Sequence, residues 1–334
     1  NVSIFSLVVG FMLPANAIAT FNSIEVSTLD GSNDTTNAQT FTSTASSPSE
    51  DNFNDDVFLE GVTFGSGSSS ATISGAANFA AVNRITVVSG REGNGSDANV
   101  NGESGFSDDN NDGDPDNFAK VGLDINNDQE STDPLTQDLG LFSALNNRSL
   151  SEIADGEGAE EYKLKFTFTQ GIVDSDNGND QAPELIIFER GINDKNIEIE
   201  LITGGTFDSP DTLGTSFAEE SNNYTDTGIN IRTREIDSAQ DLGIIGLDFS
   251  EDFGLTNGDP VYGIILTSTD GGADINGALL SAADTSQFRE LPEGLNSSQP
   301  NPVPFEVEGT MGFLALGGYL WYRKHKKHQR FQDQ

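Results

Sequence analysis

The sequence predicts an all-β protein, an antiparallel sandwich or jelly roll with long acidic loops and one short hydrophobic helix near the C-terminus. Three observations favour this class: short segments alternate between apolar and polar residues, turn-forming residues separate them, and helical periodicity is scarce. Glycine is frequent, with 36 residues, and Asn, Asp and Ser are abundant between the alternating segments. This layout is typical of sandwiches, in which tight turns join short strands.

Eight segments have the alternation expected of half-buried strands. The clearest is Tyr162–Thr169, in which every second residue from Tyr162 to Phe168 is aromatic or leucine. Leu185–Glu189 and Asn196–Ile202 are predicted to pair with each other around Gly191. The remaining predicted strands are Val57–Phe64, Ala81–Ser89, Thr227–Arg234, Gly243–Phe249 and Val261–Thr267.

Helical patterns are confined to two short segments. Asp138–Leu145 can form one short helix. Ser149 and Glu152 have the spacing of a capping box, which predicts a second helix that ends at Asp155-Gly156. No glycine-rich nucleotide-binding loop precedes a helix, and the glycine nonapeptide repeats of calcium β-rolls are absent from the sequence.

The charge balance excludes one large class of partners. The chain has 334 residues, and its 54 acidic and 16 basic residues give a formal net charge of −38. Such a surface repels phosphate backbones, so we expect no nucleic-acid binding. High charge with 34% hydrophobic content also fits disorder, an alternative that applies mainly to residues 30–55 and 93–117. The 22 phenylalanines favour a folded body.

The residue types available for catalysis are few. Cysteine is absent, and both histidines, His325 and His328, lie close to the C-terminus. The body therefore lacks the histidine and cysteine that a Ser-His-Asp or Cys-His mechanism, or a histidine-bound zinc site, requires. A two-carboxylate glycosidase stays open, but no pair of acids stands out among so many. We therefore expect a protein that is not an enzyme.

Two acidic clusters have spacings that suit calcium. Asp108, Asn110 and Asp112, followed by Gly113, match the first half of an EF-hand-type loop, with oxygen ligands at alternate positions and a glycine for the turn. The twelfth position is Ala119 where that loop has an acid, so the match is incomplete. The other candidate ligands are Asp114, Asp124, Asn126 and Asp128. The alternative is a solvated acidic loop, as it is for the looser cluster of Asp174, Asp176 and Asp180.

Residues 1–19 have the features of a signal peptide whose start is truncated. The apolar run Val2–Leu13 has the length of a signal-peptide core and is too short for a membrane span. Pro14 and two overlapping small-x-small patterns follow, which predicts cleavage after Ala17 or Ala19. The alternative is a buried helix or strand. Export would make residues 20–298 an acidic, β-rich extracellular domain.

Three parts follow one another at the C-terminus. Residues 299–304 form a proline-rich spacer, because each proline restrains its own φ and disfavours a helix before it. Residues 305–334 form a tail in which the uncharged run Thr310–Tyr322 precedes the basic residues 323–330. A basic cluster after an apolar run is typical of the cytoplasmic side of a membrane. We therefore expect the tail to enter a membrane.

This order resembles the sorting tails of PEP-CTERM proteins, which have a Pro-Glu-type motif, a hydrophobic helix and an Arg/Lys-rich end. Val303, Pro304, Phe305 and Glu306 stand where the Pro-Glu-Pro motif is usual, a form similar to the variant of cyanobacterial members. The resemblance implies processing by an exosortase, transient anchoring in the inner membrane, and a polysaccharide-rich cell surface or extracellular matrix. The alternative is an ordinary single-span anchor.

The leading functional hypothesis is therefore an exported surface or matrix protein with a structural or adhesive role. The alternative is a carbohydrate-binding surface module, and a glycosidase is the third hypothesis. Because the single tryptophan lies in the tail, sugar-stacking rings in the body would be Tyr162, Tyr224, Tyr262 or a phenylalanine. The alternation of its segment predicts that Tyr162 is buried.

Overall fold

The computed structural model describes nineteen stretches of the chain. They are residues 19–29, 35–42, 52–53, 56–66, 70–89, 99–103, 138, 141–142, 145–146, 148–151, 153–157, 162–174, 182–192, 197–213, 217–218, 224–231, 240–255, 258–268 and 273–296. The chain divides into two units, Asn1–Ser297 and Ser298–Gln334, and every described residue belongs to the first. Residues 1–18 of the predicted signal peptide, the spacer and the sorting tail therefore lie outside the described residues.

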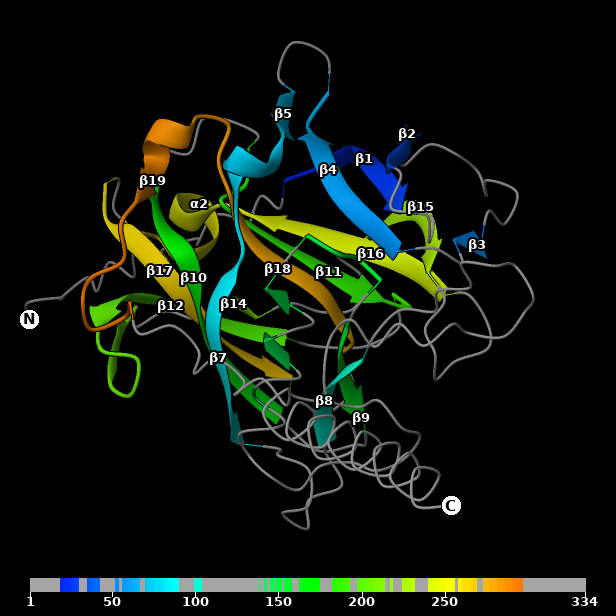
Figure 1. The fold of residues 1–334 in the computed structure, drawn as a ribbon. Coiled ribbons are helices and arrows are strands. Elements are labelled where there is room, and N and C mark those ends of the chain that lie inside the picture. Colours follow the sequence, from blue (N-terminus) through cyan, green and yellow to red (C-terminus); the bar gives the residue numbers. More distant parts are fainter. Residues whose placement is uncertain are drawn as a thin grey trace, which may run out of the picture. The chain divides into compact units, whose positions relative to one another are not determined.

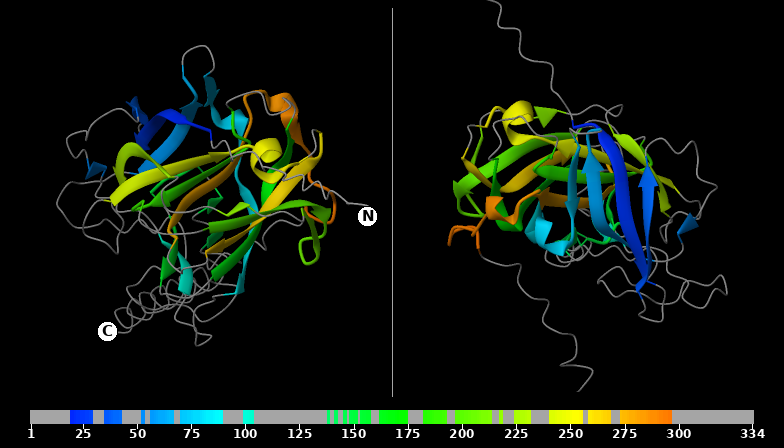
Figure 2. Two further views of the ribbon diagram at one scale, coloured as in Figure 1. Left: turned by 180° about the vertical axis from the view of Figure 1, so that it is seen from behind. Right: turned by 90° about the horizontal axis from the view of Figure 1, so that it is seen from above.

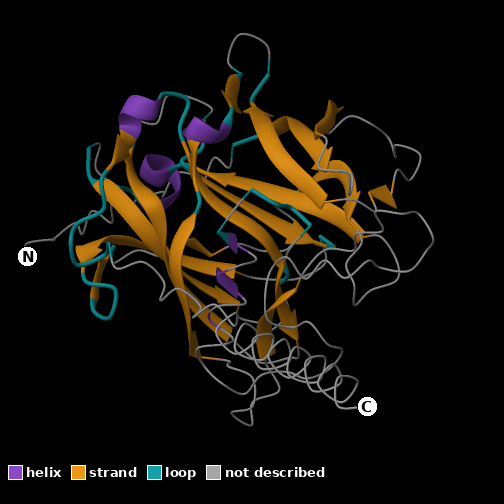
Figure 3. Cartoon of the chain, viewed as in Figure 1, coloured by secondary structure: helices purple, strands orange, loops and turns teal. Residues whose placement is uncertain are grey.

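The body is all-β, as predicted, and consists of three sheets, named A, B and C here (Figures 1 and 3). Sheet A has the strand order β2 (Thr35–Thr42), β1 (Phe21–Leu29), β4 (Asp56–Phe64) and β5 (Ala71–Ser74). Sheet B has the order β3 (Asn52–Phe53), β15 (Thr225–Ile231), β16 (Gln240–Leu247), β11 (Leu185–Arg190), β18 (Ile275–Ser281), β9 (Ile153–Glu157) and β8 (Asn99–Glu103), and β6 (Phe79–Ala80) also pairs with β18.

Sheet C is the third sheet. Its order is β13 (Pro210–Thr212), β12 (Ile197–Gly205), β17 (Pro260–Ser268), β10 (Tyr162–Val173) and β19 (Phe288–Arg289), while β14 (Phe217–Ala218) pairs with β12 and β7 (Val82–Ser89) pairs with β10. Among the described strands, every pairing is antiparallel except that of β3 with β15.

Sheet B is the middle of three layers, because its side chains enter two separate cores (Figure 2). On β11, Leu185 and Ile187 pack toward sheet C, whereas Ile186 and Phe188 pack toward sheet A. All six residues of β11 are buried, which explains why its first four residues, Leu185–Phe188, are all apolar. The sandwich predicted from the sequence therefore has an additional sheet on one side.

The strand β10 confirms the clearest predicted pattern. Tyr162, Leu164, Phe166 and Phe168 are all 0% exposed and face the core between sheets B and C. Lys163 and Lys165 lie between them and point to the opposite, outward face of sheet C. Strands β4, β7, β11, β12, β15, β16 and β17 overlap the other predicted segments.

Helical structure in the described residues is short, in agreement with the sequence. Residues 138, 141, 142 and 145 are helical, as the first predicted helix requires. The other helices are η2 (Ala76–Asn78), α2 (Phe249–Phe253) and η3 (Thr285–Gln287). Asp248 caps the N-terminus of α2, so β16 ends at Leu247, two residues before the predicted end of that strand.

The predicted pairing of Leu185–Glu189 with Asn196–Ile202 is wrong. The first segment is β11 in sheet B and the second is β12 in sheet C. Gly191 and Ile192 have φ values of 98° and 53°, and they turn the chain from one layer to the other. Both strands contribute to the same core, but they face each other across it instead of lying side by side.

The second predicted helix, from Ser149 to Asp155, is also wrong. Residues 148–151 lie along β4, where Leu59 N donates to Arg148 O and Leu150 N donates to Val57 O. Residues 153–157 form β9. Pairing with β4 satisfies the backbone groups that the helix would have used, so the tertiary contact overrides the local capping pattern.

Candidate functional site

A solvent-exposed hollow of ≈ 440 Å³ lies at the edge of sheet C where β19 meets the end of β10. Its volume is within the range of small-ligand sites, about 300 to 1,000 Å³. The lining residues are Ala77, Gln170, Thr285, Phe288, Arg289 and Glu290. They come from η2, β10, η3 and β19, so three distant parts of the chain build one surface.

Hydrogen bonds fix the two short helices that form the walls. Asn78, the last residue of η2, donates from Nδ2 to Ala282 O at 2.7 Å and accepts at its carbonyl from Ala282 N at 3.0 Å. Asp284 caps η3 by accepting from Ser286 N at 2.8 Å, while Asp284 N donates to Gln287 Oε1 at 3.3 Å. The hydrogen bonds from Ser286 lower the pKa of Asp284, so this cap is ionised at neutral pH.

The two residues of β19 have different roles in the hollow. Phe288 pairs with Ile172 and packs against the core between sheets B and C, which leaves its ring half-buried. Arg289 pairs with Gly171 and is exposed. Its Nη1 donates to Ser286 O at 2.7 Å and to Phe288 O at 2.8 Å. No carboxylate in the described part of the chain forms an ion pair with Arg289, so its charge is available to an anion.

Besides Phe288, which lines the hollow, one of the three tyrosines predicted as stacking rings is near it, Tyr262. Its ring covers Gly171, the register partner of Arg289, so closely that a Cβ on Gly171 would lie 2.3 Å from Tyr262 Cδ1. Tyr162 is fully buried, as predicted, and its hydroxyl donates to Ala273 O. Tyr224 is 7% exposed and belongs to the same core. Neither of these two rings can stack on a sugar.

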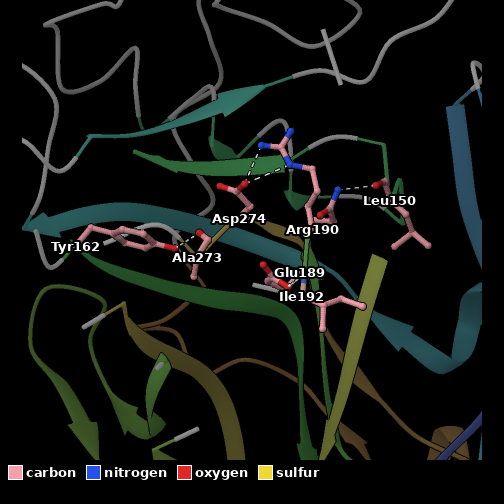
Figure 4. Close-up of polar contacts among 8 residues, drawn as sticks. Leu150, Tyr162, Glu189, Arg190, Ile192, Ala273 and Asp274 are labelled. Atoms are coloured by element: carbon pink, nitrogen blue, oxygen red, sulfur yellow. Dashed lines mark hydrogen bonds and ion pairs between the residues drawn. The ribbon is translucent and has the colours of Figure 1, made fainter. Parts of the chain in front are cut away.

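A second polar cluster lies at the end of β11, but it is closed to solvent (Figure 4). The Arg190 guanidinium donates to Asp274 Oδ2 from Nε at 3.2 Å and from Nη2 at 2.7 Å. Glu189 Oε2 accepts from Ile192 N at 2.9 Å. Arg190 is 2% exposed and Glu189 is 0% exposed. Because these charges are buried and engaged within the chain, we interpret the cluster as structural.

A third cluster, of Glu184, Asp248 and Asp252, surrounds the start of α2. Phe249 N donates to Glu184 Oε2 at 3.1 Å, and Asp248 N donates to Asp252 Oδ2 at 2.8 Å. Burial raises the pKa of Asp252 to about 7, an effect that the Asp248 backbone hydrogen bond opposes and the charges of Asp248 and Glu251 reinforce. These carboxylates accept from main-chain donors at the helix start, so their evident role is to cap α2.

The predicted calcium ligands lie outside the described residues. These are Asp108, Asn110, Asp112, Asp114, Asp124, Asn126 and Asp128, and the sorting motif of Val303, Pro304, Phe305 and Glu306 also lies outside. Within the described stretches, no group of three or more acidic or histidine side chains could hold a metal ion. Calcium binding by the two acidic clusters stays a prediction.

Comparisons with protein-family models, curated proteins and solved structures found no match to this chain. Across the part of the chain that the structure describes, no helix is long and apolar enough to cross a membrane.

Proposed function

We propose that this chain is an exported adhesive protein of the cell surface or extracellular matrix, and that it binds a saccharide in the hollow beside β19. The observation that carries the proposal is the composition of the hollow. A half-buried ring, Phe288, lies among four polar groups that converge from different elements. Sugars present apolar C–H faces and hydroxyls at their rims, and such a combination matches both.

The rigidity of the walls supports binding. The hydrogen bonds of Asn78 and Asp284 hold η2 and η3 in place before a ligand arrives. Binding to a pre-organised surface loses less side-chain and loop entropy than binding to a mobile one. The hollow is therefore suited to hold a weakly interacting ligand such as a sugar.

The same hollow favours binding over hydrolysis. Glycosidases use two carboxylates on either side of the scissile bond, about 5 to 9.5 Å apart. Glu290 is the single carboxylate among the described lining residues. With no histidine or cysteine in the body, we propose that the protein is not an enzyme.

The proposed export and cell-surface location are based on the sequence. The predicted signal peptide in residues 1–19 and the tail with Val303, Pro304, Phe305 and Glu306 are the grounds for export, for an exosortase-like processing partner, and for transient anchoring in the membrane. Intact mass of native surface material tests this part of the proposal. Loss of residues before about Thr20 and after about Pro304 supports it, because both ends are removed in processing. Retention of residues 323–330 would contradict it.

Saccharide binding is tested by affinity electrophoresis of the full chain through gels that contain neutral or acidic polysaccharides. Retardation by at least one polymer, lost in Gln170→Ala/Thr285→Ala, supports the hollow as the site. The control is Thr72→Ala, which removes an exposed hydroxyl on β5, a strand of sheet A that contributes no lining residue to the hollow. The proposal fails if no polymer retards the wild-type chain, or if the control loses retardation equally.

A further inference from the structure

The hollow beside β19 contains two opposite charges that do not pair with each other. Arg289 and Glu290 both line it, and both residues are exposed. Within the described part of the chain neither of them forms an ion pair, although such pairs occur elsewhere, as between Arg148 and Glu60. A ligand that enters the hollow therefore meets a cation and an anion that are not already neutralised.

Arg289 is a fixed hydrogen-bond donor. Its Nη1 donates to Ser286 O at 2.7 Å and to Phe288 O at 2.8 Å. These two contacts hold one corner of the planar guanidinium against the backbone. The N–H groups of Nε and Nη2 remain for a ligand, because a guanidinium carries donors on all three nitrogens.

The other polar groups of the hollow complement this donor. The carboxylate of Glu290 can only accept hydrogen bonds, whereas the Gln170 amide and the Thr285 hydroxyl can donate and accept. The half-buried ring of Phe288 lines the same hollow. Each sugar hydroxyl is both a donor and an acceptor, so a sugar can satisfy all of these groups while its C–H face lies on the ring.

The charges around the hollow disfavour charged sugars of either sign. An acidic sugar that paired with Arg289 would bring its carboxylate into the same hollow as Glu290. Asp284, next to the lining residue Thr285, is ionised as well, because hydrogen bonds from Ser286 lower its pKa. The chain as a whole has a formal net charge of −38. An amino sugar that paired with Glu290 would in turn meet the charge of Arg289. An uncharged sugar avoids both penalties.

We infer that the hollow selects uncharged sugars, and that Glu290 and Arg289 recognise neighbouring hydroxyls of one ring. This inference rests on the proposed function and names its ligand class and two residues that determine specificity. One hydroxyl donates to the Glu290 carboxylate, and the oxygen of its neighbour accepts from the Arg289 guanidinium. Hydrogen bonds with one ionised partner are about twice as strong as those between neutral groups.

Polymers that differ only in charge test the selectivity. Dextran, galactan and mannan are each compared with their carboxymethylated forms in equilibrium titrations of the full chain. We expect at least one uncharged polymer to bind, and its carboxymethylated form to bind at least about tenfold more weakly. Binding of the uncharged polymer should change less than about twofold between 50 and 500 mM salt, because the ligand has no charge to screen.

Two substitutions of opposite charge test the roles of the residues. Arg289→Gln and Glu290→Gln should both weaken binding of the uncharged polymer, by about fivefold or more, because each removes a charge-assisted hydrogen bond. A ligand held by simple charge attraction would respond to them in opposite directions. The matched controls are Lys163→Gln and Glu25→Gln, which make the same changes in charge at residues that do not line the hollow and should leave binding unchanged.

Thermal unfolding shows whether each variant is folded. If Arg289→Gln loses stability, Arg289→Lys takes its place, because lysine keeps the charge but lacks the planar fork and should still weaken binding. Unchanged binding in Arg289→Lys and Glu290→Gln would overturn the inference, and so would equal losses in the two controls.

The polymer comparison separates this inference from the proposed function. A carboxymethylated polymer that binds as tightly as its uncharged form, or more tightly, would overturn the selectivity and leave saccharide binding intact. Opposite effects of Arg289→Gln and Glu290→Gln would do the same. If no polymer of either kind binds, the proposed function and the inference both fail.

Discussion

Arg190 and Asp274 are joined twice, once through their side chains and once through the backbone. The guanidinium donates to Asp274 Oδ2 at 2.7 Å, and Arg190 N donates to Asp274 O at 2.9 Å. The two residues lie at the end of β11 and immediately before β18, the two neighbouring strands at the centre of the middle sheet. This pair therefore fixes the register of the layer on which both cores pack.

Removing one partner of this pair should destabilise the protein strongly. We expect Asp274→Ala to lower the free energy of unfolding by about 3 to 5 kcal/mol, because it leaves the Arg190 charge buried without its carboxylate. Urea unfolding measures the loss. The control is Glu200→Ala, whose partner Lys163 is 30% exposed, and which should lose at most about 1 kcal/mol. Similar losses in the two variants would refute the role of burial.

The parts of the fold that the sequence does not reveal are those in which tertiary contacts replace a local pattern. All seven residues of β18 are buried, so its sequence has no polar face and no alternation to detect. In β1, the pairing with β4 shifts register twice, which interrupts the period of two. By contrast, β10 has one buried and one outward face, and its pattern predicts it well.

The hollow beside β19 could not be predicted from sequence patterns, for a related reason. Ala77, Gln170 and Arg289 are far apart in the chain and meet only because β19 pairs with the end of β10. No spacing between them carries a signal. The sequence feature that could have pointed to the hollow is Arg289, a basic residue among acidic ones near the end of the folded body. It belongs to no known motif.

Gly171 should be required for the surface beside the hollow. A Cβ at this position would lie 2.3 Å from Tyr262 Cδ1 and 2.9 Å from Val261 O. We expect Gly171→Ala to lower the free energy of unfolding by about 1 to 3 kcal/mol and to weaken saccharide binding, since the ring and β19 must shift. Thermal unfolding and affinity electrophoresis measure the two effects.

The double variant Gly171→Ala/Tyr262→Ala provides the control. Removing the ring removes the closest contact, so the double variant should lose less stability than the sum of the two single variants. Strict additivity would mean that the ring of Tyr262 does not restrict this position.

Calcium should stabilise the body through the acidic loop of Asp108, Asn110 and Asp112. Ions that bind only the folded state stabilise it by mass action, about 2.7 kcal/mol at a hundredfold excess over Kd. Extracellular calcium modules bind at about 10⁻⁴ to 10⁻³ M, and magnesium substitutes poorly because it dehydrates reluctantly. We expect millimolar calcium to raise Tm and Asp112→Ala to cancel the gain. Equal shifts with calcium and magnesium would indicate diffuse screening instead of a site.

The stability of the protein should fall with rising pH because of Asp252. Burial raises the pKa of this side chain from 3.8 to about 7. Between these values the unfolded chain has released the proton and the folded chain still holds it, so the free energy of unfolding decreases by at most about 1.4 kcal/mol per pH unit. Below the lower value both states are protonated, and above the higher value both are ionised, so this contribution to the slope disappears in both ranges.

Asp252→Asn isolates this effect, because an amide keeps an acceptor for Asp248 N but does not titrate. The difference in unfolding free energy between variant and wild type should increase in favour of the variant from pH 4 to 7 and be constant above. Asp284→Asn is the control of opposite sign, since hydrogen bonds from Ser286 lower the pKa of Asp284 and its contribution is lost as pH falls. Denaturant unfolding at fixed ionic strength gives both profiles. A difference for Asp252→Asn that does not change with pH would show that Asp252 ionises normally in the folded protein.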